Sequence, residues 1–173
     1  MKRRDFLRIS ILAGIAFTGC RNTSDKNAAF IHYLDSDVGK DITLEGKILH
    51  VCPIEKLKIK LKLADGEIIR VVYPDNKPFD SSWNNKEVKI TGKLSRMNLS
   101  REEIAKNYDN KELLCHIDHT PCIDQKWIQN RWKDNSGDKI LNRDNNELLI
   151  KMRNTKSNFI RVFTISASEI KEA

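Results

Sequence analysis

The sequence lacks the short motifs that identify the common classes of nucleotide-binding and hydrolytic enzymes. Its 173 residues contain no phosphate-binding P-loop, no Gly-x-Gly-x-x-Gly, no Gly-x-Ser-x-Gly and no His-Glu-x-x-His. Paired Cys-x2-Cys knuckles, which would indicate a zinc ribbon, are missing too, as are the closely spaced cysteines of an iron–sulfur run. The sequence therefore favours a non-enzymatic role over an enzyme.

The apolar run near the N-terminus is too short to cross a membrane. Residues 9–17 would span about 13 Å as a helix, against a hydrocarbon core of about 30 Å. The run follows the cationic residues 1–8 and precedes Thr18-Gly19-Cys20, which is the pattern of an export signal. The alternative is a buried helix ending in an ordinary cysteine, but a core helix has no reason to begin with three basic residues in a row.

Two resemblances make this interpretation more specific. Residues 2–8, Lys-Arg-Arg-Asp-Phe-Leu-Arg, resemble the twin-arginine signal, and residues 17–20, Phe-Thr-Gly-Cys, resemble a bacterial lipobox with Phe17 where leucine is usual. The resemblances imply a signal peptide over residues 1–19, twin-arginine translocation, and a lipoprotein that carries palmitate and other acyl chains on Cys20. They place it in the bacterial cell envelope, lipid-anchored to a membrane on the periplasmic or outer side.

The charge of the chain does not require a nucleic acid partner. The formal net charge is +7, but residues 1–19 hold four of the 31 basic and one of the 24 acidic residues, so the chain from Cys20 onward carries +4. A mildly basic, highly charged surface is compatible with many partners. We expect the membrane as a partner through the lipid on Cys20, an envelope protein as a second partner, and no nucleic acid.

The rest of the chain is expected to form a tether over residues 20–29 and one domain over residues 30–173. Residues 57–63 alternate without a fault between apolar residues and lysines, which predicts a half-buried antiparallel strand. Asp65-Gly66 supplies the turn of a hairpin. By the same reasoning, strands are predicted at residues 42–52, 57–63, 68–73, 88–94 and 159–165, with Gly46 at a bulge or bend of the first.

Helices are expected between the fourth and fifth strands. Ser100 and Glu103 form a capping box that begins a helix ending near Asn107, and Asp124 can cap a second helix through Lys133. Ile123, Trp127, Ile128 and Trp132 form one apolar stripe, for which core packing is the preferred interpretation. Residues 134–147 are too polar for a prediction, and residues 147–152 are ambiguous between helix and strand.

These elements predict a mainly β fold of the α+β kind: a small antiparallel OB-like barrel with helices inserted after the fourth strand. Residues 40–95 resemble, at the level of pattern, small bacterial envelope proteins with such a barrel, an uncharacterised family. The resemblance implies the fold and no particular function, because this fold hosts many functions.

The soft ligands of the domain lie in two short stretches of sequence. His50 and Cys52 are two residues apart, so on a strand they point to the same face, and Pro121 indicates a turn within residues 115–122. Thiolate and imidazole are the ligands that zinc, iron and copper prefer. We expect one metal site built from His50, Cys52, Cys115, His119 and Cys122, with His116 in reserve.

Two function classes remain open on the sequence alone. In the first, the protein binds a transition metal ion (zinc, iron or copper) or a redox cofactor and acts as an accessory or metal-handling protein. In the second, it is an OB-like binding module for a partner protein or a glycan, with a structural Cys115–Cys122 disulfide and a buried free Cys52. Reduced and functionally idle thiols are a third interpretation of the cysteines. The twin-arginine route, which carries folded proteins and often their cofactors, favours the first class.

Overall fold

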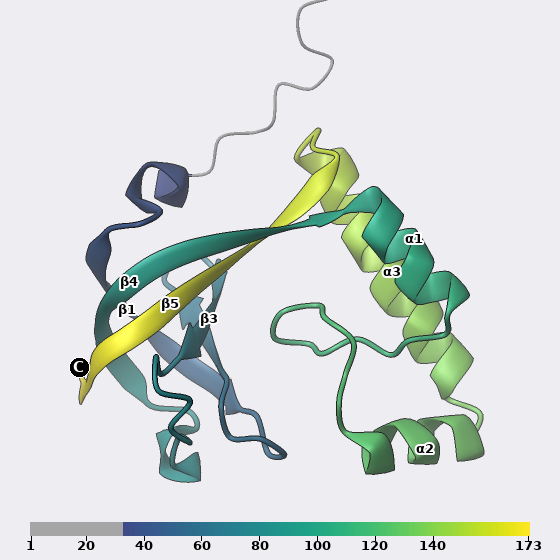
Figure 1. Cartoon of the computed structure of the whole chain (residues 1–173), viewed down its shortest axis with the longest axis horizontal. Coiled ribbons are helices and arrows are strands. Elements are labelled where there is room, and N and C mark those ends of the chain that lie inside the picture. Colours follow the sequence, from purple (N-terminus) through teal and green to yellow (C-terminus); the bar gives the residue numbers. More distant parts are fainter. Residues whose placement is uncertain (1–32) are drawn as a thin grey trace, which may run out of the picture.

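The computed structural model describes residues 33–173. The predicted signal peptide, the tether and Cys20 lie outside the described residues. Five strands form a closed barrel in the order β1-β2-β3-β5-β4 (Figure 1). Their bounds are Asp41–Val51 for β1, Ile59–Leu63 for β2, Ile68–Val72 for β3, Glu87–Ser100 for β4 and Phe159–Glu172 for β5.

The strand pairing confirms the predicted barrel. Neighbouring strands are antiparallel except for β3 and β5, which pair in parallel around Val71 and Ile165 and close the barrel. The helices α1 (Arg101–Asp109), α2 (Gln125–Lys133) and α3 (Gly137–Asn154) all lie between β4 and β5, as expected. Two short 3-10 segments, η1 (Tyr33–Asp37) and η2 (Ser81–Trp83), complete the described elements.

The alternation of apolar and polar residues fills the barrel. Along β2 the side chains of Ile59, Leu61 and Leu63 are buried, whereas Lys62 between them is exposed. Each fully buried Ile or Leu side chain stabilises the fold by about 1.5–3 kcal/mol relative to an exposed one. Gly46 is no bulge: the register of β1 shifts between Ile48 and His50. The glycine instead lets the backbone of Lys62 approach, since a Cβ there would collide with the Lys62 carbonyl.

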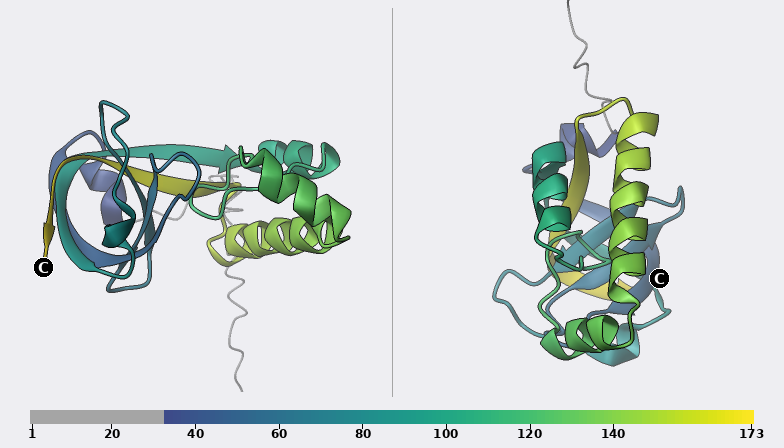
Figure 2. Two further views of the ribbon diagram at one scale, coloured as in Figure 1. Left: turned by 90° about the horizontal axis from the view of Figure 1, so that it is seen from below. Right: turned by 90° about the vertical axis from the view of Figure 1, so that its right-hand side faces the viewer.

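Both β4 and β5 extend past the residues predicted for them, β4 to Ser100 at the end that carries the helices and β5 to Glu172 at the other end. They pair continuously out to Ser100 and Phe159, and α1 and α3 lie side by side at that end (Figures 1 and 2). A second apolar cluster fills the space between strands and helices, made of Leu99, Ile104, Leu114, Leu148, Met152 and Ile160. The helix α3 includes most of residues 134–147, which are too polar for a prediction from the sequence, and shows that the ambiguous residues 147–152 are helical.

The predicted helix starts are confirmed by their caps. Ser100 Oγ accepts from the Glu103 N–H at 3.1 Å, and Glu103 Oε2 accepts from the Ser100 N–H at 2.7 Å. Asp124 Oδ1 accepts from the Trp127 N–H at 2.9 Å. The apolar stripe along α2 was expected to pack in the core, but it is only partly buried. No residue of α2 is fully buried, and Ile123 is half exposed. Among residues 33–173, no helix is both long and apolar enough to span a membrane.

Candidate functional site

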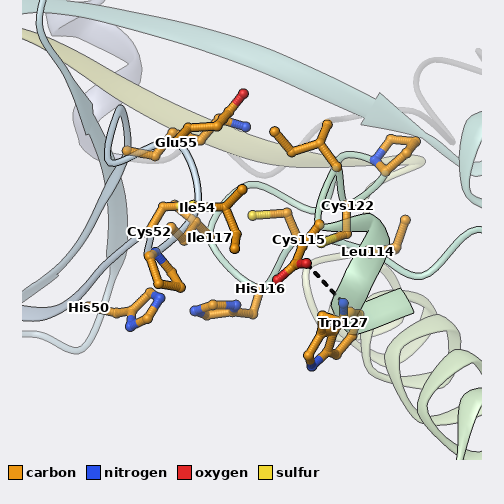
Figure 3. A pocket seen from close by; sticks show the side chains of 15 residues that line it. His50, Cys52, Ile54, Glu55, Leu114, Cys115, His116, Ile117, Cys122 and Trp127 are labelled. Carbon is orange, nitrogen blue, oxygen red and sulfur yellow. Dashed lines mark hydrogen bonds between the residues drawn. The ribbon is translucent and has the colours of Figure 1, made fainter. Parts of the chain in front are cut away.

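A pocket of about 260 Å³ lies between the β1–β2 loop and the loop that connects α1 to α2. Both cysteine- and histidine-containing stretches reach it. His50, Cys52, Cys115, His116 and Cys122 all line this pocket, and Figure 3 shows their side chains gathered around it. Segments far apart in the sequence therefore meet at one place.

The first stretch reaches the pocket from the end of β1. The Val51 N–H donates to Asn84 Oδ1 at 2.8 Å, which fixes the strand between His50 and Cys52. Beyond the strand, the Cys52 N–H donates to the Lys58 carbonyl at 2.8 Å and the Cys52 carbonyl accepts from the Lys56 N–H at 3.0 Å. These bonds hold Cys52 at the mouth of a tight turn, facing the second stretch.

The second stretch folds back on itself as a small hairpin over residues 113–122. Leu114 and Pro121 form an antiparallel bridge. The Cys115 N–H donates to the Thr120 carbonyl at 2.7 Å, and the Cys122 N–H donates to the Leu113 carbonyl at 2.8 Å. In this pattern Cys115 lies opposite residue 120, so Cys115 and Cys122 are diagonal neighbours on one face of the hairpin.

A buried carboxylate fixes the hairpin to the barrel. Asp118 has no exposed surface, and its Oδ2 lies 2.9 Å from both Lys58 Nζ and Arg70 Nη1. Its Oδ1 accepts from Thr120 Oγ1 at 2.7 Å. Burial would raise the pKa of this carboxyl, but the hydrogen bonds from Thr120, Lys58 and Arg70 outweigh it and hold the pKa well below its usual range. Asp118 therefore stays ionised and orients the hairpin.

Two histidines face each other across the junction of the two stretches. The ring centroids of His50 and His116 are 4.7 Å apart. Burial lowers the pKa of both imidazoles, and the charge of Lys60 lowers both further. Lys60 Nζ also donates to the His116 carbonyl at 2.9 Å. Within residues 33–173, His50 Nε2 is buried and has no hydrogen-bond partner. Neutral rings of this kind offer lone pairs to a ligand.

The described cysteines are free thiols, so no disulfide joins Cys115 to Cys122 in this structure. Burial raises the pKa of the Cys115 thiol. The backbone N–H groups of Ile117 and Asp118 donate to its sulfur and act in the opposite direction. Burial outweighs these hydrogen bonds, so the pKa of Cys115 lies above its ordinary value.

The structure brings five of the six expected ligands to one pocket and places His119 elsewhere. His119 has a positive φ of 57° at the turn of the hairpin and is not among the pocket residues. Burial, followed by the charges of Lys151 and Lys60, lowers its pKa to about 4. Within residues 33–173, no three His, Cys, Asp or Glu side chains stand at the spacing that would hold a metal ion.

Several residues of the site were not identified from the sequence. Ile54, Ile117 and Trp127 supply apolar walls of the pocket. The lysines of residues 57–63, expected to face solvent, include Lys58 and Lys60, which instead contact the hairpin. The one signal in the sequence for these contacts is Asp118, an acidic residue within the hairpin that could pair with a lysine.

The chain was compared with protein-family models, curated proteins and solved structures, and none matches it.

Proposed function

We propose that this protein is a membrane-anchored lipoprotein of the bacterial envelope that binds a transition metal ion or redox cofactor in the pocket, as an accessory or metal-handling protein. The observation that carries the proposal is the meeting of two distant stretches: His50 and Cys52 at the end of β1 line the same pocket as Cys115, His116 and Cys122. Five soft donors in one apolar pocket are the ligand types that zinc, iron and copper select.

The electrostatics of the pocket support the same proposal. The lowered pKa values of His50 and His116 keep both rings neutral, which is the form that binds metals. The unpartnered Nε2 of His50 is a buried polar atom for which a ligand would supply the missing contact. Small side-chain rotations would have to bring the donors to within bonding distance, and the pocket volume of about 260 Å³ leaves room for them.

The test combines metal content with a thiol count. Protein purified without chelator is analysed for metals, and free thiols are counted under denaturing conditions. We expect metal close to one equivalent per chain, and Cys52→Ser and Cys122→Ser should each abolish it, because the two stretches share one ion. His119→Asn is the matched control: asparagine tolerates the positive φ, and the imidazole lies outside the pocket. Metal that survives either serine substitution would contradict the shared site.

The anchoring part of the proposal rests on residues 1–20. We expect Cys20→Ser to leave an unlipidated precursor that no longer partitions into detergent, because the acyl chains are attached to that thiol. Replacement of Arg3 and Arg4 by lysine should block export, whereas a general secretory signal would tolerate it. A Cys20→Ser protein that partitions like the wild type after signal removal would refute the lipoprotein assignment.

The second candidate is a binding module for a partner protein or a glycan. It is favoured by the position of the pocket between the β1–β2 loop and the β4–β5 connection, where OB barrels bind their ligands. Ile54 and Ile123 at this pocket are 52% and 50% exposed. Under this candidate the cysteines serve only structure, so the purified protein would contain no metal and one free thiol from Cys52, with Cys115 and Cys122 joined.

A further inference from the structure

The spacing of the hairpin cysteines suits a bridging ion better than a disulfide. Cys115 and Cys122 are diagonal across the Leu114–Pro121 bridge, and diagonal neighbours on paired strands have Cα atoms about 7–8 Å apart. A disulfide requires a Cα separation of about 4.4–6.8 Å and a bond between sulfurs of about 2 Å. Two metal–sulfur bonds of about 2.3 Å in line would join sulfurs about 4.6 Å apart. A two-coordinate ion therefore spans this pair without moving the hairpin backbone.

Cationic side chains lie beside Cys115. Lys58 and Lys60 both lie close enough for their charges to act on the Cys115 sulfur. The charge of Asp118 acts on Cys115 in the opposite direction, but this carboxylate is engaged with Lys58 and Arg70. The positive charges around the hairpin would thus attract a dithiolate complex of a monovalent ion, which carries one negative charge.

From these observations we propose that the ion is monovalent copper, held between the thiolates of Cys115 and Cys122. The inference rests on the proposed metal-binding function and names the ion and its first two ligands. Each thiol releases its proton to solvent when its sulfur bonds to copper, and no change of oxidation state is involved. Monovalent copper is soft and is satisfied by two or three sulfur donors, whereas zinc takes four ligands. Cys52, on the opposite wall of the same pocket, is available as a third donor.

The first experiment is a competition for the reduced full chain under anaerobic conditions. The chain is given equimolar Cu(I) and Zn(II), desalted in the presence of bicinchoninate, and analysed for both metals and by X-ray absorption. We expect copper to be retained with two or three sulfur neighbours. Cys115→Ser and Cys122→Ser should lose it to bicinchoninate, and Cys52→Ser should lose it as well, because bicinchoninate outcompetes a site that lacks its third sulfur donor.

A pair of lysine variants tests the electrostatic part. Lys60→Gln removes a positive charge beside the hairpin while keeping a hydrogen-bond donor for the His116 carbonyl. Lys62→Gln removes the same charge two residues along the same strand, where the side chain is exposed. We expect the first variant to weaken copper binding by a factor of about 3–10 and the second to leave it nearly unchanged. Equal effects of the two variants would overturn the electrostatic argument.

The outcomes separate this inference from the function on which it rests. Zinc retained in preference to copper, with loss in all three cysteine variants, would overturn the copper assignment and leave the metal-binding function standing. Neither metal retained by the reduced chain would refute both. Copper retained equally by Cys115→Ser and the unsubstituted chain would overturn the hairpin pair as its ligands.

Discussion

Removal of the Asp118 carboxylate is expected to loosen the hairpin from the barrel and to destabilise the domain. In Asp118→Ala, Lys58 and Arg70 would keep their places beside the hairpin without the carboxylate that lies 2.9 Å from each. Thr120 would also lose the acceptor of its hydroxyl proton. Because Asp118 lies between Cys115 and Cys122, the same substitution should weaken metal binding through the hairpin.

The size of the effect follows from burial of the charges. Breaking a buried ion pair by removing one partner costs about 3–5 kcal/mol, because the other charge is left buried and unpaired. The side chains of Lys58 and Arg70 are each 23% exposed, so they regain part of their hydration. We therefore expect the free energy of unfolding to fall by about 2–3 kcal/mol. For a domain of this size the melting temperature should fall by about 10 °C.

The assay is urea unfolding followed by far-ultraviolet circular dichroism. Its midpoint should fall by about 1–2 M while the slope with urea stays unchanged. Asp37→Ala is the matched control, because its carboxylate pairs with exposed Lys40 at 3.0 Å and should change the stability by no more than about 0.5 kcal/mol. Adding Lys58→Met to Asp118→Ala should recover part of the loss, since it removes one unpaired cation. Asp118→Ala unfolding at the same urea concentration as the control would refute the reasoning.

Three further substitutions test the barrel and its helical insertion. Gly92→Ala should destabilise the fold by about 1–3 kcal/mol, because a Cβ there collides with the backbone of β5 at Ser166; a wild-type urea midpoint would show that the strands can separate to admit it. Ser100→Ala should cost about 1 kcal/mol by removing the cap of α1, with no loss measured in urea counting against a stabilising role of the cap. Leu61→Ala should cost about 2–5 kcal/mol in the same assay, since it leaves a cavity among fully buried side chains, and a cost below 1 kcal/mol would indicate that the barrel collapses around it.

The local elements of this fold could be predicted because their signals are local. Alternation with a period of two marks β2, and the Ser100–Glu103 capping box marks the start of α1. The outer half of β4 could not be predicted in the same way. There, exposed residues such as Arg96 and Asn98 pair with β5 beyond the barrel, and helices cover one face, so the core no longer imposes strict alternation. The length of β4 therefore depends on what packs against it.

For the candidate site, residue types alone identified Cys52, Cys115 and Cys122 as donors, because thiolates are uncommon and chemically distinctive. The strand period also predicted that His50 and Cys52 share one face of a strand, but β1 ends at Val51 and Cys52 lies just beyond it. Only the tertiary structure decided that both stretches reach one pocket and that His119 does not. The cause is the Asp118 carboxylate, whose ionic contacts with the barrel set the orientation of the hairpin. Such contacts join positions far apart in the chain, and no periodicity or spacing in the sequence encodes them.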